Sequence, residues 1–415
     1  MKRTAIFALV LAASAAALSG QTYQMFSEEM NQIREKAPFS FGPLRLFPSL
    51  ALRNVGYDSN VFFDAQAKAD YTGTFSPEVR AYLPVGGTIL FMARENPEYS
   101  YYLKEKNRRE FSNSFGFGLR ALVLGRFVLD GSAHYDKHRR SQSSELGALV
   151  TDTSKGYEAG MTFETPRRTS LGIKAVFNDI SLEDYAPSET GAPLSGILNR
   201  KERGLQAEFN YEISPGGYFF LTGAYTEFAF SSASSTWKDS TAMEGFAGIR
   251  FPIGGTIRGT LALGYKKLVP REAGSAEFSG LVGKTEIEGR FGRLGLRASY
   301  SRDSVFSVWS DVLYFVDSRY GAGASFYLTP FLRLDYNYGL GNADYPDFPG
   351  AGEASGEGSS GRRRDDHATH SAGIVVRLFG NTGLGLTWNS ARWTSTMAGW
   401  DRRREFIGAF LTYEF

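Results

Sequence analysis

The sequence predicts an all-β fold, a transmembrane antiparallel up-and-down β-barrel of about 18 strands. Apolar and polar residues alternate with period two from about Leu50 to Phe415, which indicates strands with two different faces. The connections between these strands switch regularly between short and long. After Gly20 there is no run of about 18 apolar residues, so helices are not expected to cross a membrane in the mature chain.

The composition limits the classes of function. The chain has 415 residues, 42% hydrophobic and 22% charged, and its 46 Lys and Arg residues nearly balance its 44 Asp and Glu residues. This balance excludes a nucleic-acid-binding surface built from bulk positive charge. The absence of cysteine excludes disulfides, thiolate metal sites and cysteine nucleophiles. A mean hydropathy of −0.26 is too polar for a protein that spans a membrane with many helices.

The N-terminus predicts export and a short leading segment. Lys2 and Arg3 precede an apolar run that ends in small residues, which is typical of a cleavable secretory signal over residues 1–20. Gln21 stands where a lipoprotein would need its lipidated cysteine, so no lipid anchor is expected there. Residues 21–48 are predicted to form a periplasmic or plug-like segment, and the barrel to occupy 49–415. Helical spacing predicts one short helix within 23–37, with its apolar residues at Met25, Phe26, Met30 and Ile33.

The segment 205–213 shows the two faces of a strand most clearly. Its odd positions are apolar and its even positions are polar or charged. The same pattern recurs in 171–178, 243–251, 294–300 and 332–338. Burying the charged rows in a dry core would be costly even if they were paired, and a water-filled interior removes most of that cost. The apolar rows are therefore predicted to face lipid and the polar rows to face a lumen.

Eight short connections alternate with nine long ones. The short ones have the chemistry of hairpin turns, and both chain ends are predicted to lie on their side of the barrel. They are Pro84–Gly87, Gly125–Arg126, Pro166–Arg168, Ser214–Gly217, Pro252–Gly255, Gly292–Arg293, Thr329–Pro330 and Gly380–Asn381. The long ones lie around 58–70, 95–108, 136–153, 178–203, 229–240, 267–277, 301–316, 341–369 and 389–404.

The interval of about 40 residues between short turns could also indicate a propeller or a solenoid. A propeller blade would place four short strands in each interval. Here each interval holds two strands of about 10 to 14 residues, longer than the strands of most soluble sheets. Such strands match a tilted crossing of a hydrocarbon core, which favours the membrane barrel.

The last strand resembles that of bacterial outer-membrane barrels. Leu411, Tyr413 and the terminal Phe415 lie on one apolar row. The resemblance implies a location in the bacterial outer membrane and recognition of these residues by the barrel assembly machinery. The stretch Val55-Gly-Tyr-Asp-Ser-Asn-Val61 resembles the opening strand of the putative beta-barrel porin 2 type, a set sometimes tied to envelope polysaccharide export. The same residues also fit a strand end capped by Asp58, Ser59 and Asn60.

The predicted lumen supplies the candidate functional residues. The densest charged ladder is Lys284, Glu286, Glu288 and Arg290. Such a ladder fits either a constriction that sorts solutes by charge or ion pairs that stiffen the wall, and the even mixture of signs favours the ion pairs. Other inward candidates for the constriction are Arg250, Arg258, Arg297, Arg333 and Asp335.

Catalytic and metal sites have little support in the sequence. Asp365, Asp366, His367 and His370 could bind a divalent metal, but their spacing is no strong motif and a solvated loop beside Arg362–Arg364 is favoured. Ser132, His134 and Asp136 share one inward row, without the strand-to-helix elbow of a hydrolase. The Gly-rich stretch 350–361 lacks a phosphate-binding ending and fits an external loop. We therefore expect no catalytic residue, no bound metal and no cofactor.

These observations predict a channel for passive diffusion of small hydrophilic solutes. The expected partners are outer-membrane lipid, the barrel assembly machinery and the solutes, and not nucleic acid. Two alternatives stay open: a barrel for polysaccharide export, and a structural or surface-interaction barrel without an open pore. The sequence assigns neither a solute nor an oligomeric state.

Overall fold

The computed structural model describes residues 25–63, 66–140, 145, 150–184, 193–346, 363–378, 381–397 and 399–415. The predicted signal peptide at 1–20 and the Gly-rich stretch 350–361 lie outside the described residues. The predicted short helix is confirmed as α1, Phe26–Lys36. None of the helices in the described residues is long and apolar enough to span a bilayer.

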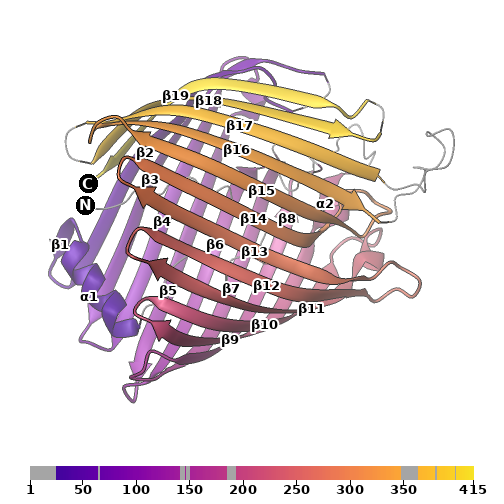
Figure 1. Ribbon diagram of the computed structural model, residues 1–415. Coiled ribbons are helices and arrows are strands. Elements are labelled where there is room, and N and C mark those ends of the chain that lie inside the picture. The colour runs from indigo at the N-terminus through magenta and orange to yellow at the C-terminus, as the bar shows by residue number, and fades with distance from the viewer. Residues whose placement is uncertain are drawn as a thin grey trace.

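Eighteen antiparallel strands, β2 to β19, form a closed barrel, which confirms the predicted fold class (Figure 1). Each strand pairs with its neighbours in sequence, and β19 pairs with β2 to complete the ring. A three-residue strand, β1 (Phe39–Phe41), pairs with the start of β2. The barrel strands are β2 Leu44–Asp58, β3 Asp70–Val85, β4 Ile89–Tyr102, β5 Glu110–Val123, β6 Phe127–Arg140, β7 Val150–Glu164, β8 Ser170–Leu182, β9 Arg200–Ser214, β10 Gly217–Phe230, β11 Ser240–Ile253, β12 Ile257–Pro270, β13 Phe278–Phe291, β14 Leu294–Phe306, β15 Tyr314–Tyr327, β16 Leu332–Tyr345, β17 Arg363–Arg377, β18 Thr382–Ser395 and β19 Arg402–Glu414.

The predicted alternation of turns and loops is also present. Each of the eight predicted short connections lies at the junction of two paired strands, and both described chain ends lie at the short-turn end (Figure 1). Some of the predicted turn residues, Pro84, Ser214, Gly217 and Pro252, belong to the strands themselves. The first barrel strand begins at Leu44, ahead of the boundary expected at 49. Short helices occupy the loops: η2 (Lys106–Arg108), α2 (Leu194–Leu198) and η3 (Thr236–Lys238).

Several long connections are shorter than predicted. The loop expected at 95–108 begins only after Tyr102, because β4 continues through Pro97. Pro97 has no N–H to donate, and the backbone pairing of β4 with β3 is interrupted there, between Tyr99 opposite Phe75 and Glu95 opposite Val79. The side-chain amide of Asn96 donates to the Pro77 carbonyl at 2.7 Å, and this bond takes the place of the missing backbone donor. A proline in these strands therefore does not mark a loop.

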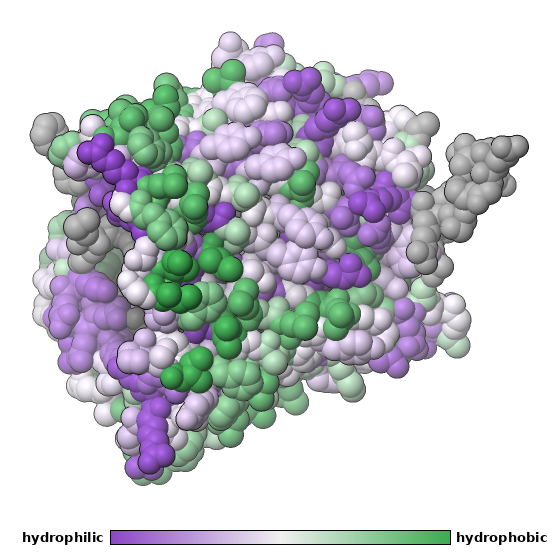
Figure 2. Space-filling view, in the orientation of Figure 1, coloured by the Kyte–Doolittle hydropathy of each residue, from purple (hydrophilic) through white to green (hydrophobic). Residues whose placement is uncertain are grey.

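The outer surface of the wall is apolar. Outward residues such as Met243, Leu263 and Ile407 are each more than 60% exposed. Hydrophobic side chains cover much of the wall in Figure 2, and most strongly hydrophilic ones gather toward its two ends. Exposure of this kind is costly in water and is expected of a lipid-facing surface.

The stretch Val55–Val61 fastens the first strand to the last at the long-loop end. Asp58 is 1% exposed, and both of its carboxylate oxygens accept hydrogen bonds from Arg404. Ser59 N–H donates to the Glu405 carbonyl at 2.9 Å, and the Glu405 N–H donates to the Ser59 hydroxyl at 2.8 Å. A Cβ on Gly56 would lie 2.1 Å from the Ile407 carbonyl oxygen, so only glycine fits there. We call this contact between β2 and β19 the closing clasp.

Candidate channel lumen

The predicted ladder and its companions all lie on the inner face of the wall. Leu281 and Phe291 of β13 point outward, at 58% and 49% exposure, so the even-numbered positions between them point inward. Register pairing extends this assignment to the neighbouring strands. The inward candidates are Lys284, Glu286, Glu288 and Arg290 on β13, Arg250 on β11, Arg258 on β12, Arg297 on β14, and Arg333 and Asp335 on β16.

Ion pairs join several of these residues near the short-turn end. Glu288 lies between Arg258 and Arg297, with an ion pair to each, the second at 3.8 Å. Arg333 and Asp335 form a pair at 2.8 Å. The Arg258 and Arg297 side chains keep 46% and 40% of their surface exposed. A group that is charged and exposed on an inner wall implies water inside the barrel.

Arg250 differs from the other candidates because it is packed into the wall. It is 7% exposed and lies 4.6 Å from the centre of the Phe220 ring. Its guanidinium reaches Glu208 at 3.6 Å. The structure therefore separates Arg250 from the exposed residues of β12 to β16.

The helix α1 packs against the inner wall at the short-turn end (Figure 1). Phe26, Met30 and Ile33 form one buried face against Leu90 of β4 and Val128 of β6. The helical spacing of these residues was visible in the sequence, but their partners on the wall were not.

Acidic residues of α1 fix the helix to wall arginines. Glu29 pairs with Arg120 of β5, and Glu28 pairs with Arg168 in the β7–β8 turn. The backbone N–H of Phe26 donates to Glu164 at 3.3 Å. Burial raises the pKa of Glu29, and the charge of Arg120 offsets part of this effect.

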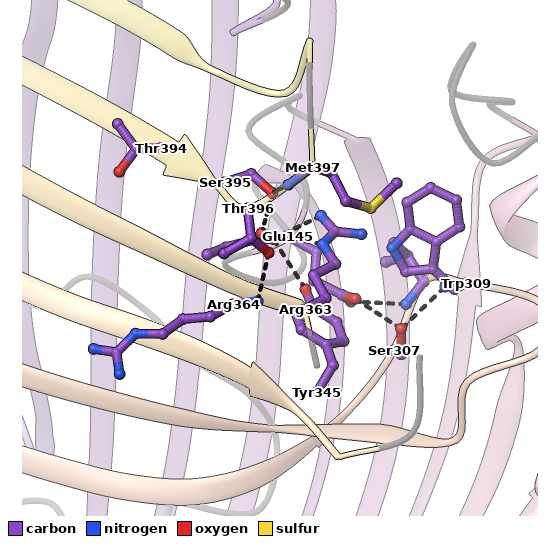
Figure 3. Close-up of polar contacts among 12 residues, drawn as sticks. Glu145, Ser307, Trp309, Tyr345, Arg363, Arg364, Thr394, Ser395, Thr396 and Met397 are labelled. Carbon is purple, nitrogen blue, oxygen red and sulfur yellow. Dashed lines mark hydrogen bonds and ion pairs between the residues drawn. The ribbon is translucent and has the colours of Figure 1, made fainter. Parts of the chain in front are cut away.

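At the long-loop end, loop residues converge inside the barrel (Figure 3). The Lys238 ammonium, fully buried, donates to the carbonyls of Ser307 and Trp309 at 2.8 and 2.7 Å. Glu145 accepts hydrogen bonds from the Ser307 hydroxyl and the Val308 N–H at 2.7 and 2.8 Å. Burial lowers the pKa of Lys238 to about 7 and raises that of Glu145. Sequence reasoning missed both residues, because nothing in the pattern of a polar loop marks a buried charge.

The prediction of a solvated loop at Arg362–Arg364 is wrong for the described part of that run. Arg363 begins β17 and is 1% exposed. Its guanidinium pairs with Asp365 at 2.6 Å and lies about 5 Å from the rings of Trp309, Tyr345 and Trp400. Aromatic faces and a carboxylate thus replace water around this cation.

The structure does not bring together the four residues considered as metal ligands in the sequence. Asp365 and His367 point inward from β17, whereas Asp366 and His370 point outward. His367 stacks on Trp393, with ring centres 4.8 Å apart. Strand alternation separates these four residues into two pairs on opposite faces of the wall.

The inward row of β6 places Asp136 between two histidines. His134 and His138 lie 3.9 and 3.8 Å from its carboxylate. Within the described residues, no hydrogen bond joins Ser132 to His134, and Asp136 instead accepts one from Ser114 of β5. This arrangement does not supply a serine hydroxyl activated by a histidine.

The C-terminal residues lie on the outward row at the short-turn end. Leu411 is opposite Leu52 of β2, and Tyr413 is opposite Leu50. The rings of Tyr413 and Phe415 are 4.5 Å apart, and Phe415 also lies near Phe39 of β1.

Residues 39–415 match the model of the family described as Putative beta-barrel porin 2. No curated protein matches the sequence. Solved structures with a similar fold include the outer membrane protein opdK from Pseudomonas aeruginosa (TM-score 0.52, 13% identity, 89% of this chain and 98% of that chain). They also include OccAB3 from Acinetobacter baumannii (0.52, 12%, 89% and 99%) and OccK2 from Pseudomonas aeruginosa (0.52, 13%, 89% and 97%).

At these identities the solved structures show the fold alone, whereas the family model covers nearly all of the chain. The resemblance of the first and last strands is therefore confirmed. The chain belongs to the family described as Putative beta-barrel porin 2 and is a β-barrel of the bacterial outer membrane.

Proposed function

We propose that the barrel is a channel through which small hydrophilic solutes diffuse passively, without chemical change. The observation that carries this proposal is the exposure of charged side chains inside a closed wall, such as Arg258 and Arg297. A barrel of 16 to 18 strands has room for an aqueous channel, whereas an eight-stranded one is filled by its own side chains. Two structures of this fold were solved with small solutes, opdK with vanillate and OccK2 in complex with glucuronate, and they support solutes of that size.

The contacts of α1 support a second part of the proposal, that residues 21–48 narrow the periplasmic mouth. The helix is held by an apolar face and by two ion pairs to the wall. The apolar outer rows support outer-membrane lipid as a partner, and Leu411, Tyr413 and Phe415 support the assembly machinery as another.

Single-channel recording in a planar lipid bilayer tests the channel. We expect steady current steps from the native chain, and larger steps from a variant that lacks residues 25–37, which removes α1 and leaves every barrel strand intact. Absence of steps from both proteins would refute the proposal.

One observation favours export of a neutral polysaccharide as a second candidate function. The inner face of β16 to β18 has a middle region of small, uncharged polar side chains, which can hydrogen-bond to sugar hydroxyls. These residues are Asn337, Thr369, Ser371, Thr387 and Asn389. Added dextran fragments should then interrupt the current for longer than uncharged polyethylene glycol of equal size, and equal interruption would count against this candidate.

A further inference from the structure

Five arginines form an arc on the inner wall near the short-turn end. Each arginine lies close to the short-turn end of its strand. The strands run from β12 to β17, and among them β15 contributes Tyr327 in place of an arginine. The described contacts of α1 are with β2 to β7 and the β7–β8 turn, so the arc belongs to another part of the ring. The arginine arc is Arg258 on β12, Arg290 on β13, Arg297 on β14, Arg333 on β16 and Arg377 on β17.

The charge of the arginine arc is only partly neutralised. Its five positive charges are paired with two carboxylates, Glu288 and Asp335. Glu288 is shared by two arginines, and Asp335 also accepts a hydrogen bond from Ser325 at 2.6 Å. In the described part of the chain, no carboxylate lies within ion-pair distance of Arg290 or Arg377. Both of these side chains are exposed.

Aromatic packing fixes part of the arc in place. The guanidinium groups of Arg290 and Arg333 lie 4.5 and 5.9 Å from the centre of the Tyr327 ring. Arg290 can reach this ring across β14 because the inward residue opposite it is Gly295, which has no side chain. Stacking on an aromatic ring positions a guanidinium and leaves its N–H donors available.

Five acidic residues at the same end of the barrel are paired or covered. Glu158 pairs with Lys174 at 2.9 Å, and Glu212 with Arg168 at 3.4 Å. Glu164 is 5% exposed and accepts the Phe26 N–H. Glu28 and Glu29 of α1 are bound to wall arginines. Within the described residues, none of these five carboxylates forms an ion pair with an arginine of the arc, so the arc itself keeps an excess of positive charge.

We infer that the arginine arc makes the channel selective for small anions, above all for organic carboxylates. This inference rests on the proposed channel function and adds to it the class of solute. Fixed cations on a low-dielectric wall raise the local concentration of anions. A guanidinium can also bind a carboxylate through two parallel hydrogen bonds, which favours carboxylates over spherical anions.

The test measures the reversal potential of single channels under a tenfold gradient of KCl. The native channel should pass chloride in preference to potassium. In the variant Arg290→Gln/Arg377→Gln, the ratio of chloride to potassium permeability should fall by about two-fold or more. This variant breaks no ion pair within the described residues, so the barrel should fold. A matched control, Arg126→Gln/Arg167→Gln, removes the same charge from exposed turn residues at the same end and should keep the native ratio.

A second measurement addresses the solute. Sodium galacturonate should block the chloride current at lower concentration than galactose, and the Arg290→Gln/Arg377→Gln variant should lose this difference. A native channel that prefers potassium, or a variant with an unchanged ratio, overturns the inference while the channel itself stands. Absence of any current steps overturns the inference together with the channel function.

Discussion

Replacing Asp58 with Asn should weaken the closing clasp between the first and last strands. The Asp58 carboxylate is almost fully buried, and it accepts hydrogen bonds from Arg404 and from the Asn60 N–H. The substitution leaves a neutral amide of similar volume in the same place. It therefore removes the charge and one set of acceptor positions while it keeps the packing.

The size of the effect follows from the burial of the two partners. Removing one member of a fully buried ion pair costs about 3 to 5 kcal/mol. The Arg404 side chain, however, is 30% exposed and can regain water, so we expect a loss of about 2 to 3 kcal/mol. For a chain of this length, such a loss lowers the unfolding midpoint by about 2 to 3.5 °C.

The assay is the temperature at which the folded, fast-migrating form disappears on SDS gels. A double-mutant cycle with Asp58→Asn and Arg404→Gln should give a coupling energy above about 1.5 kcal/mol. The control is Arg403→Gln, at the neighbouring position on the outward row. The Arg403 side chain is 74% exposed, and its ion pair with Glu405 should contribute less than about 0.5 kcal/mol. A cycle that gives Asp58 and Arg404 no more coupling than this surface pair would refute the reasoning.

Three further substitutions test other parts of the structure. Glu95 lies on the outward row of β4 between Val79 and Phe115, and Glu95→Leu should stabilise the barrel in lipid by about 1 to 2 kcal/mol in urea titrations; destabilisation would contradict its lipid-facing position. Lys238 has a pKa of about 7 in the folded chain, against 10.5 for an unfolded lysine. Between pH 7 and pH 10.5 the unfolded chain therefore holds more protons on this lysine than the folded chain does. The stability of the native chain relative to Lys238→Met should therefore rise with pH above 7, by up to about 1.4 kcal/mol per unit in thermal unfolding, and a flat or falling difference would contradict the burial of its ammonium. Met30→Asp should undock α1 and enlarge the single-channel current, whereas Asn31→Asp on the exposed face should not; equal currents would exclude a helix that narrows the mouth.

Much of the barrel could be predicted because each strand of the wall has one face toward lipid and the other toward water. The odd row of 205–213 meets lipid and the even row meets water, so period two is enforced over almost every strand. Turn chemistry then fixes where the chain reverses, as at Gly216 and Gly292, whose φ values are 76° and 60°.

The remaining features depend on contacts between residues far apart in the sequence. Pro97 suggests a loop until the amide of Asn96 is seen to replace its missing donor. Arg363 suggests a hydrated loop until three aromatic rings from separate segments surround it. The arginine arc is assembled from five strands, and its excess charge is visible only once the register shows which carboxylate each arginine meets.

Phe39, which precedes the first barrel strand, and the terminal Phe415 lie on one side of the barrel, with their rings 6.1 Å apart. A short linker could therefore join them, and new ends could be cut in the loop at 271–277, which contains Gly274 with φ 91°. Such a circular permutant would keep every strand pairing but turn the last strand into an internal one. Whether it still inserts into the outer membrane would separate two requirements for assembly, the sequence of β19 and its position at the end of the chain.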